Sequence, residues 1–261
     1  MFRKASPLAW MFHRNTSRWP HNMLALPDAA AQSVPPYKEY QSVPSLSLPD
    51  AQLPSVSLSQ AIEARHSCRR FTNNALKIQE LATLFKMAYG IEGRIFFQDQ
   101  EFLERPVPSG GGLYPLELYL LVQQVEGLDP GIYHYAVLDH SLEQLKVLQL
   151  PEKIISNLFL DQPYLTSAAS IVVLTAVLER SLWKYGDRGY RYILLEAGHV
   201  AQNLNLTATA LGIGSFNLGG FFDDDLALLL DLNIEEEIPL YGVALGRPAT
   251  DDHAEQRQPS H

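Results

Sequence analysis

The segment from Trp183 to Gly214 constrains the fold of this chain more than any other stretch. From Tyr190 onward, apolar and small side chains recur every three or four residues, which is the period of one face of an α-helix. They are Tyr190, Ile193, Leu194, Ala197, Ala201, Leu204, Ala208 and Leu211. Apolar residues also fall on the other sides, and a helix that is apolar nearly all round is buried. We therefore predict a central helix over 189–211, roughly 35 Å long, which ends at Gly212 and forms half of a subunit interface.

The composition excludes several classes of protein. Twenty basic and 29 acidic side chains give a net charge of −9, which argues against a nucleic-acid or anionic-membrane partner. The single cysteine, Cys68, excludes an internal disulfide and a cysteine-clustered zinc site, and no His/carboxylate spacing indicates a metal. No apolar run reaches the roughly 20 residues that span a bilayer. We expect a cytoplasmic protein with no bound metal.

The chain divides into three parts by composition. Residues 1–57 hold eight of the 17 prolines and predict an extended Pro-rich N-terminal arm. Because this arm also carries Trp10 and Trp19, we expect it to lie against the body or a second subunit. Residues 58–250 form the main domain, and residues 251–261 a flexible polar tail.

The main domain mixes helices and strands without regular β-α-β alternation, so the predicted fold class is α+β. Ser57 and Gln60 fit a capping box. The predicted helices cover 60–65, 78–88, 151–159 and 223–230. The predicted strands are Leu116–Val122, a hairpin of Gly131–Val137 with Leu142–Leu148, Ser170–Leu178 and Leu240–Leu245.

Two loops could bind an anionic ligand. In Arg65-His66-Ser67-Cys68-Arg69, two guanidinium groups with a hydroxyl between them can converge on one phosphate; the alternative is a solvated basic loop with a structural histidine. In Pro108-Ser109-Gly110-Gly111-Gly112, the glycines allow the backbone to approach a ligand closely; the alternative is a simple turn. The second loop is neither a Walker loop nor a dinucleotide fingerprint.

Two further features flank the central helix. Lys184-Tyr185, with Arg188 and Arg191, places cations at a helix start, where the helix dipole disfavours charge and favours a neutral amine able to take a proton. The alternative is a surface lysine and a core tyrosine. Gly219-Gly220, after the helix, is a second glycine turn. His199, on the helix itself, is expected to be a core histidine.

In this order, the motifs resemble the FMN-dependent nitroreductase superfamily, and within it the SagB-type azoline dehydrogenases of thiazole/oxazole-modified peptide pathways. The resemblance runs from about Leu58 to Pro248. Its most specific element is K-Y-x-x-R-x-Y-R at 184–191 followed by E-A-G-H-x-x-Q-N at 196–203. Arg65–Arg69 is similar to the flavin-phosphate clamp and 108–115 to the subgroup's P-S-x-G-G-L-Y-P loop, although Gly110 stands where alanine is frequent. G-G-F at 219–221 and L-G-R-P at 245–248 complete the series.

The resemblance implies a nitroreductase-like homodimer with a central mixed or antiparallel sheet, the long helix at the interface and FMN between the subunits. It implies that Lys184 and Tyr185 are catalytic. The cofactor-binding residues that it implies are Arg65, His66, Ser67, Arg69, Pro108, Ser109, Gly110, Gly111, Gln202, Asn203, Gly219, Gly220 and Arg247, of which Arg65, Ser67, Arg69 and Arg247 hold the phosphate.

The implied reaction is oxidation of thiazoline or oxazoline rings in a peptide, with a cyclodehydratase and a precursor peptide as partners. One alternative is an NAD(P)H-dependent reductase of nitro or quinone compounds. Another is a flavin-binding scaffold subunit of a peptide-modifying complex.

Overall fold

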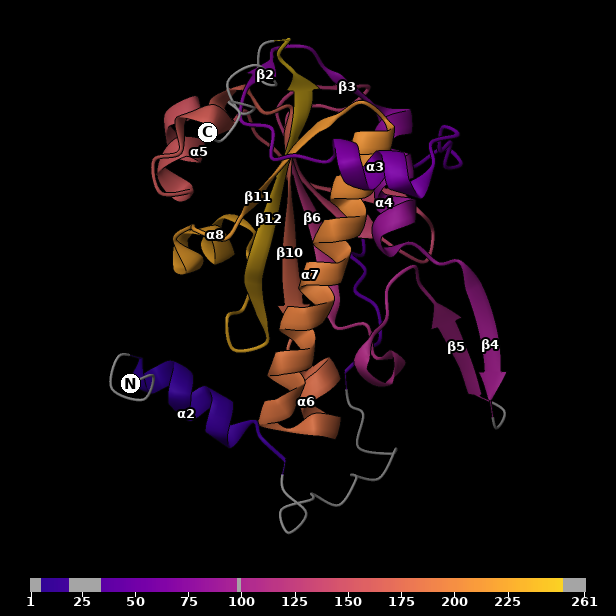
Figure 1. Ribbon diagram of the computed structural model, residues 1–261, viewed down its shortest axis with the longest axis vertical. Helices are drawn as coiled ribbons and strands as arrows, with labels where there is room; N and C mark the ends of the chain where they lie inside the picture. Colours follow the sequence, from indigo (N-terminus) through magenta and orange to yellow (C-terminus); the bar gives the residue numbers. More distant parts are fainter. Residues whose placement is uncertain (1–5, 19–33, 98–99, 251–261) are drawn as a thin grey trace, which may run out of the picture.

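A large antiparallel sheet organises the computed structural model, which describes residues 6–18, 34–97 and 100–250 (Figure 1). The strand order is β1-β9-β8-β6-β10-β12-β11, and β2 pairs with the end of β12. These strands are β1 (Ser45–Ser47), β2 (Phe71–Thr72), β6 (Leu116–Val122), β8 (Gly131–Ala136), β9 (Ser141–Val147), β10 (Ser170–Val177), β11 (Gly214–Leu218) and β12 (Glu237–Pro248). The predicted α+β class is confirmed.

The two central strands, β6 and β10, are buried and mainly apolar because helices cover both faces of the sheet. Val172 of β10 lies opposite Leu120 of β6 and Val243 of β12, and all three side chains join the core beneath α4 (Ile78–Tyr89) and α7 (Asp187–Ala210). The alternate residues Ile171 and Val173 join a second core that includes side chains of α5 (Glu152–Leu158) and α8 (Asp223–Leu229). This period of two is the side-chain alternation of a strand.

The long helix is real, but it is not buried all round. α7 has 24 residues and crosses the sheet (Figure 1). Its core face includes Ile193, Ala197 and Leu204. A second stripe is exposed: Leu194 (42%), Leu195 (57%), Gly198, His199 and Gln202. The prediction that His199 is a core histidine is therefore wrong.

The N-terminal segment contains more regular structure than an extended arm. α2 (Pro7–Asn15) lies beside the start of α7, and β1 adds an edge strand next to β9. Trp19 and residues 251–261 lie outside the described residues. The domain division at residue 57 stays a prediction.

Several elements were not expected from the sequence. The helix ends next to Gly212 as predicted, but strand β11, which begins at Gly214, was not expected. The hairpin of β4 (Gly93–Phe97) with β5 (Gln100–Glu104), which projects from the body (Figure 1), was not expected either. α3 (Leu58–Ala64) overlaps the helix predicted at 60–65 and has the predicted capping box. The other elements are β3 (Leu76–Lys77), η2 (Gly110–Gly112), β7 (Val125–Glu126), η3 (Pro163–Ser167) and α6 (Glu179–Tyr185). Within the described ranges, no helix combines the length and hydropathy needed to cross a membrane.

Candidate active site

The glycine loop and the Lys-Tyr pair come together in space. Gly111 has a φ of +71°, and a Cβ at this position would lie 2.5 Å from Tyr185 Oη and 3.0 Å from Lys184 Nζ. Glycine is therefore needed both for the backbone conformation and for the close approach. Lys184 Nζ also lies 5.6 Å from the centroid of the Tyr185 ring. The predicted catalytic pair thus lies directly against the predicted flavin-facing loop.

Tyr185 has a perturbed pKa. Burial raises the pKa of the Tyr185 phenol, and the neighbouring Tyr192 raises it further. The two rings meet edge to face with centroids 5.0 Å apart. The phenol therefore stays protonated at neutral pH and can donate a hydrogen bond.

The surroundings of Lys184 differ from the sequence expectation. Lys184 lies in the last turn of α6, and Gly186, with a φ of +54°, separates α6 from α7. A cation is favoured at a helix C-terminus, so the argument that a helix start favours the neutral amine is wrong.

Arg188 and Arg191, which do lie at the start of α7, bind the C-terminal end of α2. Arg188 Nη1 donates to Thr16 O at 2.8 Å, and Arg191 Nη2 donates to His13 O at 3.2 Å. Cations at these carbonyls complement the α2 dipole, which explains why the sequence places them against the dipole of α7.

The basic segment, residues 65–69, lies near the C-terminal end of α7, whereas Lys184 lies near the N-terminal end. α3 packs beside the C-terminal part of α7, whereas α6 joins its N-terminal end (Figure 1). After α3, the backbone N–H of Cys68 donates to Ser215 O of β11 at 2.9 Å, and the Arg69 guanidinium lies 4.5 Å from the Phe216 ring centroid. Arg65, His66 and Ser67 are half-buried in this turn. Within one chain, most of the length of α7 separates the basic segment from Lys184.

Arg247 extends the basic end of the molecule. It pairs with Thr72 in the β12–β2 ladder, and its Nη2 lies 2.6 Å from Glu80 Oε2 of α4. The same end therefore holds Arg65, Arg69 and Arg247 on adjoining elements, with the Arg247 guanidinium already bonded to a carboxylate.

The remaining predicted residues lie after β11, on α7 and at the glycine loop. Gly219 and Gly220 follow β11, and Gly220 is close to Leu160. Gln202 is exposed on α7, whereas the Asn203 amide donates to Pro106 O at 3.3 Å, just before the glycine loop. Pro108 is exposed at the start of that loop.

Sequence reasoning did not assign a role to a buried polar cluster behind the glycine loop. Glu196 of α7 accepts a hydrogen bond from Tyr89 Oη at 2.8 Å, and the Arg105 guanidinium lies 4.2 Å from the Tyr89 ring centroid. All three side chains are buried. The available signal was a glutamate at a core position of an apolar helix, since an acidic residue is seldom fully buried without partners.

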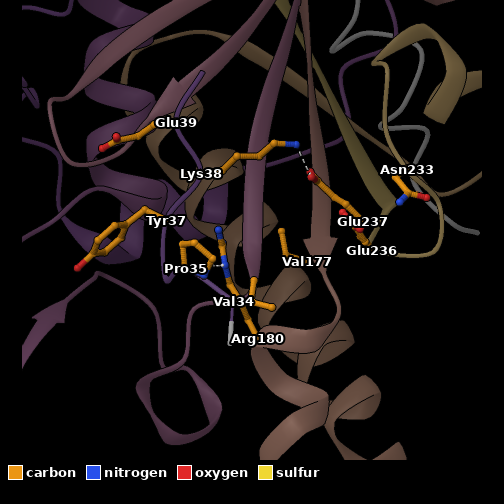
Figure 2. Close-up of a pocket in the computed structure, with 10 residues that line it drawn as sticks. All are labelled: Val34, Pro35, Tyr37, Lys38, Glu39, Val177, Arg180, Asn233, Glu236 and Glu237. Carbon is orange, nitrogen blue, oxygen red and sulfur yellow. Dashed lines mark hydrogen bonds and ion pairs between the residues drawn. The ribbon is translucent and has the colours of Figure 1, made fainter. Parts of the chain in front are cut away.

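A cavity of about 270 Å³ lies elsewhere, between residues 34–39 and strands β10 and β12 (Figure 2). Three of its charged groups, Lys38, Glu237 and Arg180, have partners. Lys38 Nζ lies 2.6 Å from Glu237 Oε2, and Arg180 Nε donates to Pro35 O at 2.8 Å. None of the predicted site residues is among its described lining residues.

The fold and these motifs define a flavin oxidoreductase class, and sequence comparison agrees. Residues 62–247 match the model of the Nitroreductase family, so the chain belongs to this family, whose members are flavin oxidoreductases.

Two relatives show how far the similarity extends. MJ1384 of Methanocaldococcus jannaschii, which is named as a nitroreductase, is 34% identical to this chain over 205 residues. The alignment covers 77% of this chain and 96% of that protein. The microcin B17-processing protein McbC of Escherichia coli is 32% identical over 146 residues. That alignment covers 54% of each protein, so this chain spans about half of McbC.

Solved structures show the same fold. A crystal structure from Anabaena variabilis, described as that of a nitroreductase, has a TM-score of 0.77 at 27% identity and covers 97% of this chain but 48% of that one. The Escherichia coli microcin synthetase complex McbBCD, bound to truncated pro-MccB17, has a TM-score of 0.63 at 24% identity over 93% of this chain and 92% of the matched chain.

Proposed function

We propose that this chain is a SagB-type, FMN-dependent dehydrogenase that oxidises thiazoline or oxazoline rings of a modified peptide to thiazoles or oxazoles. The observation that carries the proposal is the packing of Lys184 and Tyr185 against Gly111. The similarity to McbC, which processes microcin B17, supports a peptide substrate. By the same analogy, the partners are a cyclodehydratase and a precursor peptide.

The donor chemistry of the chain fits FMN. Guanidinium groups of Arg65 and Arg69 with the Ser67 hydroxyl suit a phosphate monoester. Arg247 lies at the same end, where it is paired with Glu80. Backbone at Gly110, Gly111, Gly219 and Gly220 carries no side chain that would keep a planar ring at a distance. When bound, FMN supplies the two-electron acceptor of the oxidation.

A homodimer would complete the site. The exposed stripe of α7 combines Leu194 and Leu195 with Gly198, whose Cβ position has no atom within 4 Å, so a second helix can approach closely here. If two copies of α7 pack antiparallel through this stripe, the Lys184 end of one copy meets the Arg65 end of the other. This arrangement joins the two halves that one chain keeps apart.

The side chains divide the proton chemistry between them. Aromatising an azoline removes two hydrogens from the ring, one as a proton and the other as a hydride, which carries the two electrons. Because Tyr185 stays protonated, we assign orientation of the substrate to its hydroxyl and proton abstraction to Lys184, which acts as a base only in its neutral amine form. The half-buried position of both side chains limits access of water to the reacting carbon.

Two variants test both the chemistry and the composite site. Lys184→Ala is expected to retain FMN but to lose azole formation by about 10²–10⁴-fold, as for removal of a general base. Arg65→Ala is expected to lose FMN affinity instead. The assay follows FMN by absorbance and a loss of about 2 Da per ring by mass spectrometry, with Lys153→Ala, an exposed lysine of α5, as the matched control.

Mixing the two variants tests the homodimer. Random exchange should restore about a quarter of wild-type activity, since half of the dimers would then contain one intact site. No recovery on mixing, despite subunit exchange, contradicts a site built from two chains. Normal turnover by Lys184→Ala contradicts the assigned base.

The second candidate is an NAD(P)H-dependent nitro or quinone reductase, which is favoured by the similarity to MJ1384 along nearly all of that protein. It predicts reduction of nitro compounds by NAD(P)H that is unchanged by Lys184→Ala. The azoline proposal predicts the opposite dependence on Lys184.

A further inference from the structure

Glu196 is a buried carboxylate to which the proposed reaction assigns no role. Its side chain is 2% exposed on the core side of α7. It lies beside Ser109, which precedes the three glycines of the loop that packs on Lys184 and Tyr185.

Two hydroxyl groups direct their hydrogens at this carboxylate. Tyr89 Oη donates to Glu196 Oε1 at 2.8 Å and accepts the backbone N–H of Leu116 at 3.2 Å. The Ser109 hydroxyl is the second hydrogen-bonding group at Glu196 and accepts the backbone N–H of Tyr114 at 2.9 Å. Because each hydroxyl has one hydrogen, each chain of bonds runs from a backbone N–H to the carboxylate, which is the shared final acceptor.

The two chains of hydrogen bonds fix both ends of the glycine loop. One ends at Ser109 and Tyr114, which bracket Gly110–Gly112, and the other holds Leu116, where β6 begins. We propose that Glu196 is a positioning residue that sets the conformation of this loop against Lys184 and Tyr185. This inference rests on the proposed function only for its effect on catalysis.

Opposing effects set the pKa of Glu196. Burial raises the pKa of this carboxyl to about 7, while the hydrogen bonds of Ser109 and Tyr89 and the charge of Arg105 act in the lowering direction. These groups come from three places: Ser109 from the glycine loop, Tyr89 from α4 and Arg105 from the segment after β5. The charge of Glu117 in β6 also raises the pKa of Tyr89. Protonating Glu196 gives it a hydrogen of its own, so that it can no longer accept from both hydroxyls in their present orientation.

Amide hydrogen exchange provides a test that needs no flavin. Glu196→Gln should expose the amides of Tyr114 and Leu116 to roughly tenfold faster exchange at pH 8, because glutamine offers one acceptor where the carboxylate offers two. Glu196→Asp, which keeps the carboxylate, should recover part of the protection. Tyr89→Phe should speed exchange at Leu116 and leave Tyr114 protected. Exchange in β10 serves as the internal reference.

A catalytic readout separates positioning from simple stability. Wild-type kcat should change with an inflection near pH 7 that Glu196→Gln lacks, with a smaller change in KM. Unchanged exchange at Tyr114 and Leu116 in Glu196→Gln overturns the positioning role whatever the enzyme does. If exchange responds as expected but no azoline is oxidised, the positioning role stands and the proposed function fails.

Discussion

At the scale of single residues, Gly111 and Gly112 offer a matched pair. Both have positive φ, +71° and +67°, so an alanine at either costs about 1 kcal/mol in backbone strain. Only at Gly111 would the new methyl group meet Tyr185 and Lys184; at Gly112 no atom lies within 4 Å. We expect both alanine variants to lose similar thermal stability, because the side chains at Gly111 can move away.

The activities of the two variants should nevertheless differ. Gly111→Ala should displace the proposed catalytic pair and lower kcat by about tenfold or more, since small displacements of reacting groups are costly. Gly112→Ala should keep near-normal kcat. Melting temperature and azole formation, measured side by side, check this prediction, and equal activities would show that the contact with Lys184 and Tyr185 has no catalytic role.

At the scale of elements, α2 is a docked helix whose contacts depend on α7. Arg188 and Arg191 bind carbonyls at its C-terminal end, and Phe12 meets the Tyr190 ring edge to face with centroids 5.9 Å apart. Arg18, just beyond α2, donates to Tyr185 O at 2.8 Å, so the docked segment contacts the proposed catalytic pair. We expect α2 to stabilise the turn between α6 and α7.

Arg188→Ala should loosen α2 without unfolding the domain. Removing a charge-assisted hydrogen bond worth about 1.5–3 kcal/mol should speed amide exchange in residues 7–15 by at least about tenfold. Exchange in β6 should not change, because the core does not involve this contact. Mass-spectrometric exchange at peptide resolution makes the comparison, and full protection of residues 7–15 in the variant would contradict the docking role of Arg188.

The elements could be predicted from the sequence where periodicity reflects burial. The core faces of α4 and α7 and the buried strands β6 and β10 follow from apolar spacing alone. α2 and β1 were missed because they are stabilised by distant partners: α2 has no buried residue and β1 is exposed. The break at Gly186 was missed because glycine shows where a helix can end, whereas packing decides whether it does.

In the candidate site, too, some features could be predicted from the sequence and others depended on the fold. The residue types at 65–69, 108–112 and 184–185 were visible in the sequence, and the contact of Gly111 with Lys184 and Tyr185 agrees with their grouping. The cluster of Glu196, Tyr89 and Arg105 was not assigned, because its members lie far apart in the chain and meet only through the fold. The direction of the helix dipole at Lys184 also depended on the tertiary break.

At the scale of the whole molecule, a buried ionic network ties the N-terminal segment to the sheet. His134 of β8 is fully buried between Glu117 Oε2 of β6 at 3.0 Å and Glu143 Oε2 of β9 at 2.7 Å. Arg180 of α6 completes it, with Nη1 2.6 Å from Glu117 Oε1. The backbone N–H of Tyr40 donates to Glu143 Oε1 at 3.0 Å. Removing one partner of such a buried group costs about 3–5 kcal/mol.

The pKa values of this network predict its pH range. Burial acts to lower the pKa of His134, but hydrogen bonds and charge from Glu117 and Glu143 outweigh it and raise the pKa. Burial acts to raise the pKa of Glu117, but His134 and Arg180 outweigh it and lower the pKa. The His134 contribution to stability is therefore complete below its ordinary pKa near 6.5 and is lost as pH rises through its folded pKa. The Glu117 contribution is lost only as pH falls below about 4.5.

The free energy of unfolding should consequently fall as pH rises, in two separable steps. Between about pH 4.5 and 7, Glu196 binds more protons in the folded chain than in the unfolded chain, so stability declines with rising pH. Above pH 6.5, His134 continues the decline. Urea unfolding from pH 4.5 to 9 should show Glu196→Gln removing the lower step and His134→Gln removing the upper one, with an overall loss of about 3 kcal/mol in the histidine variant. A wild-type stability that rises across this range would contradict both assignments. A lower step that persists in Glu196→Gln, or an upper step that persists in His134→Gln, would place that titrating group elsewhere in the chain.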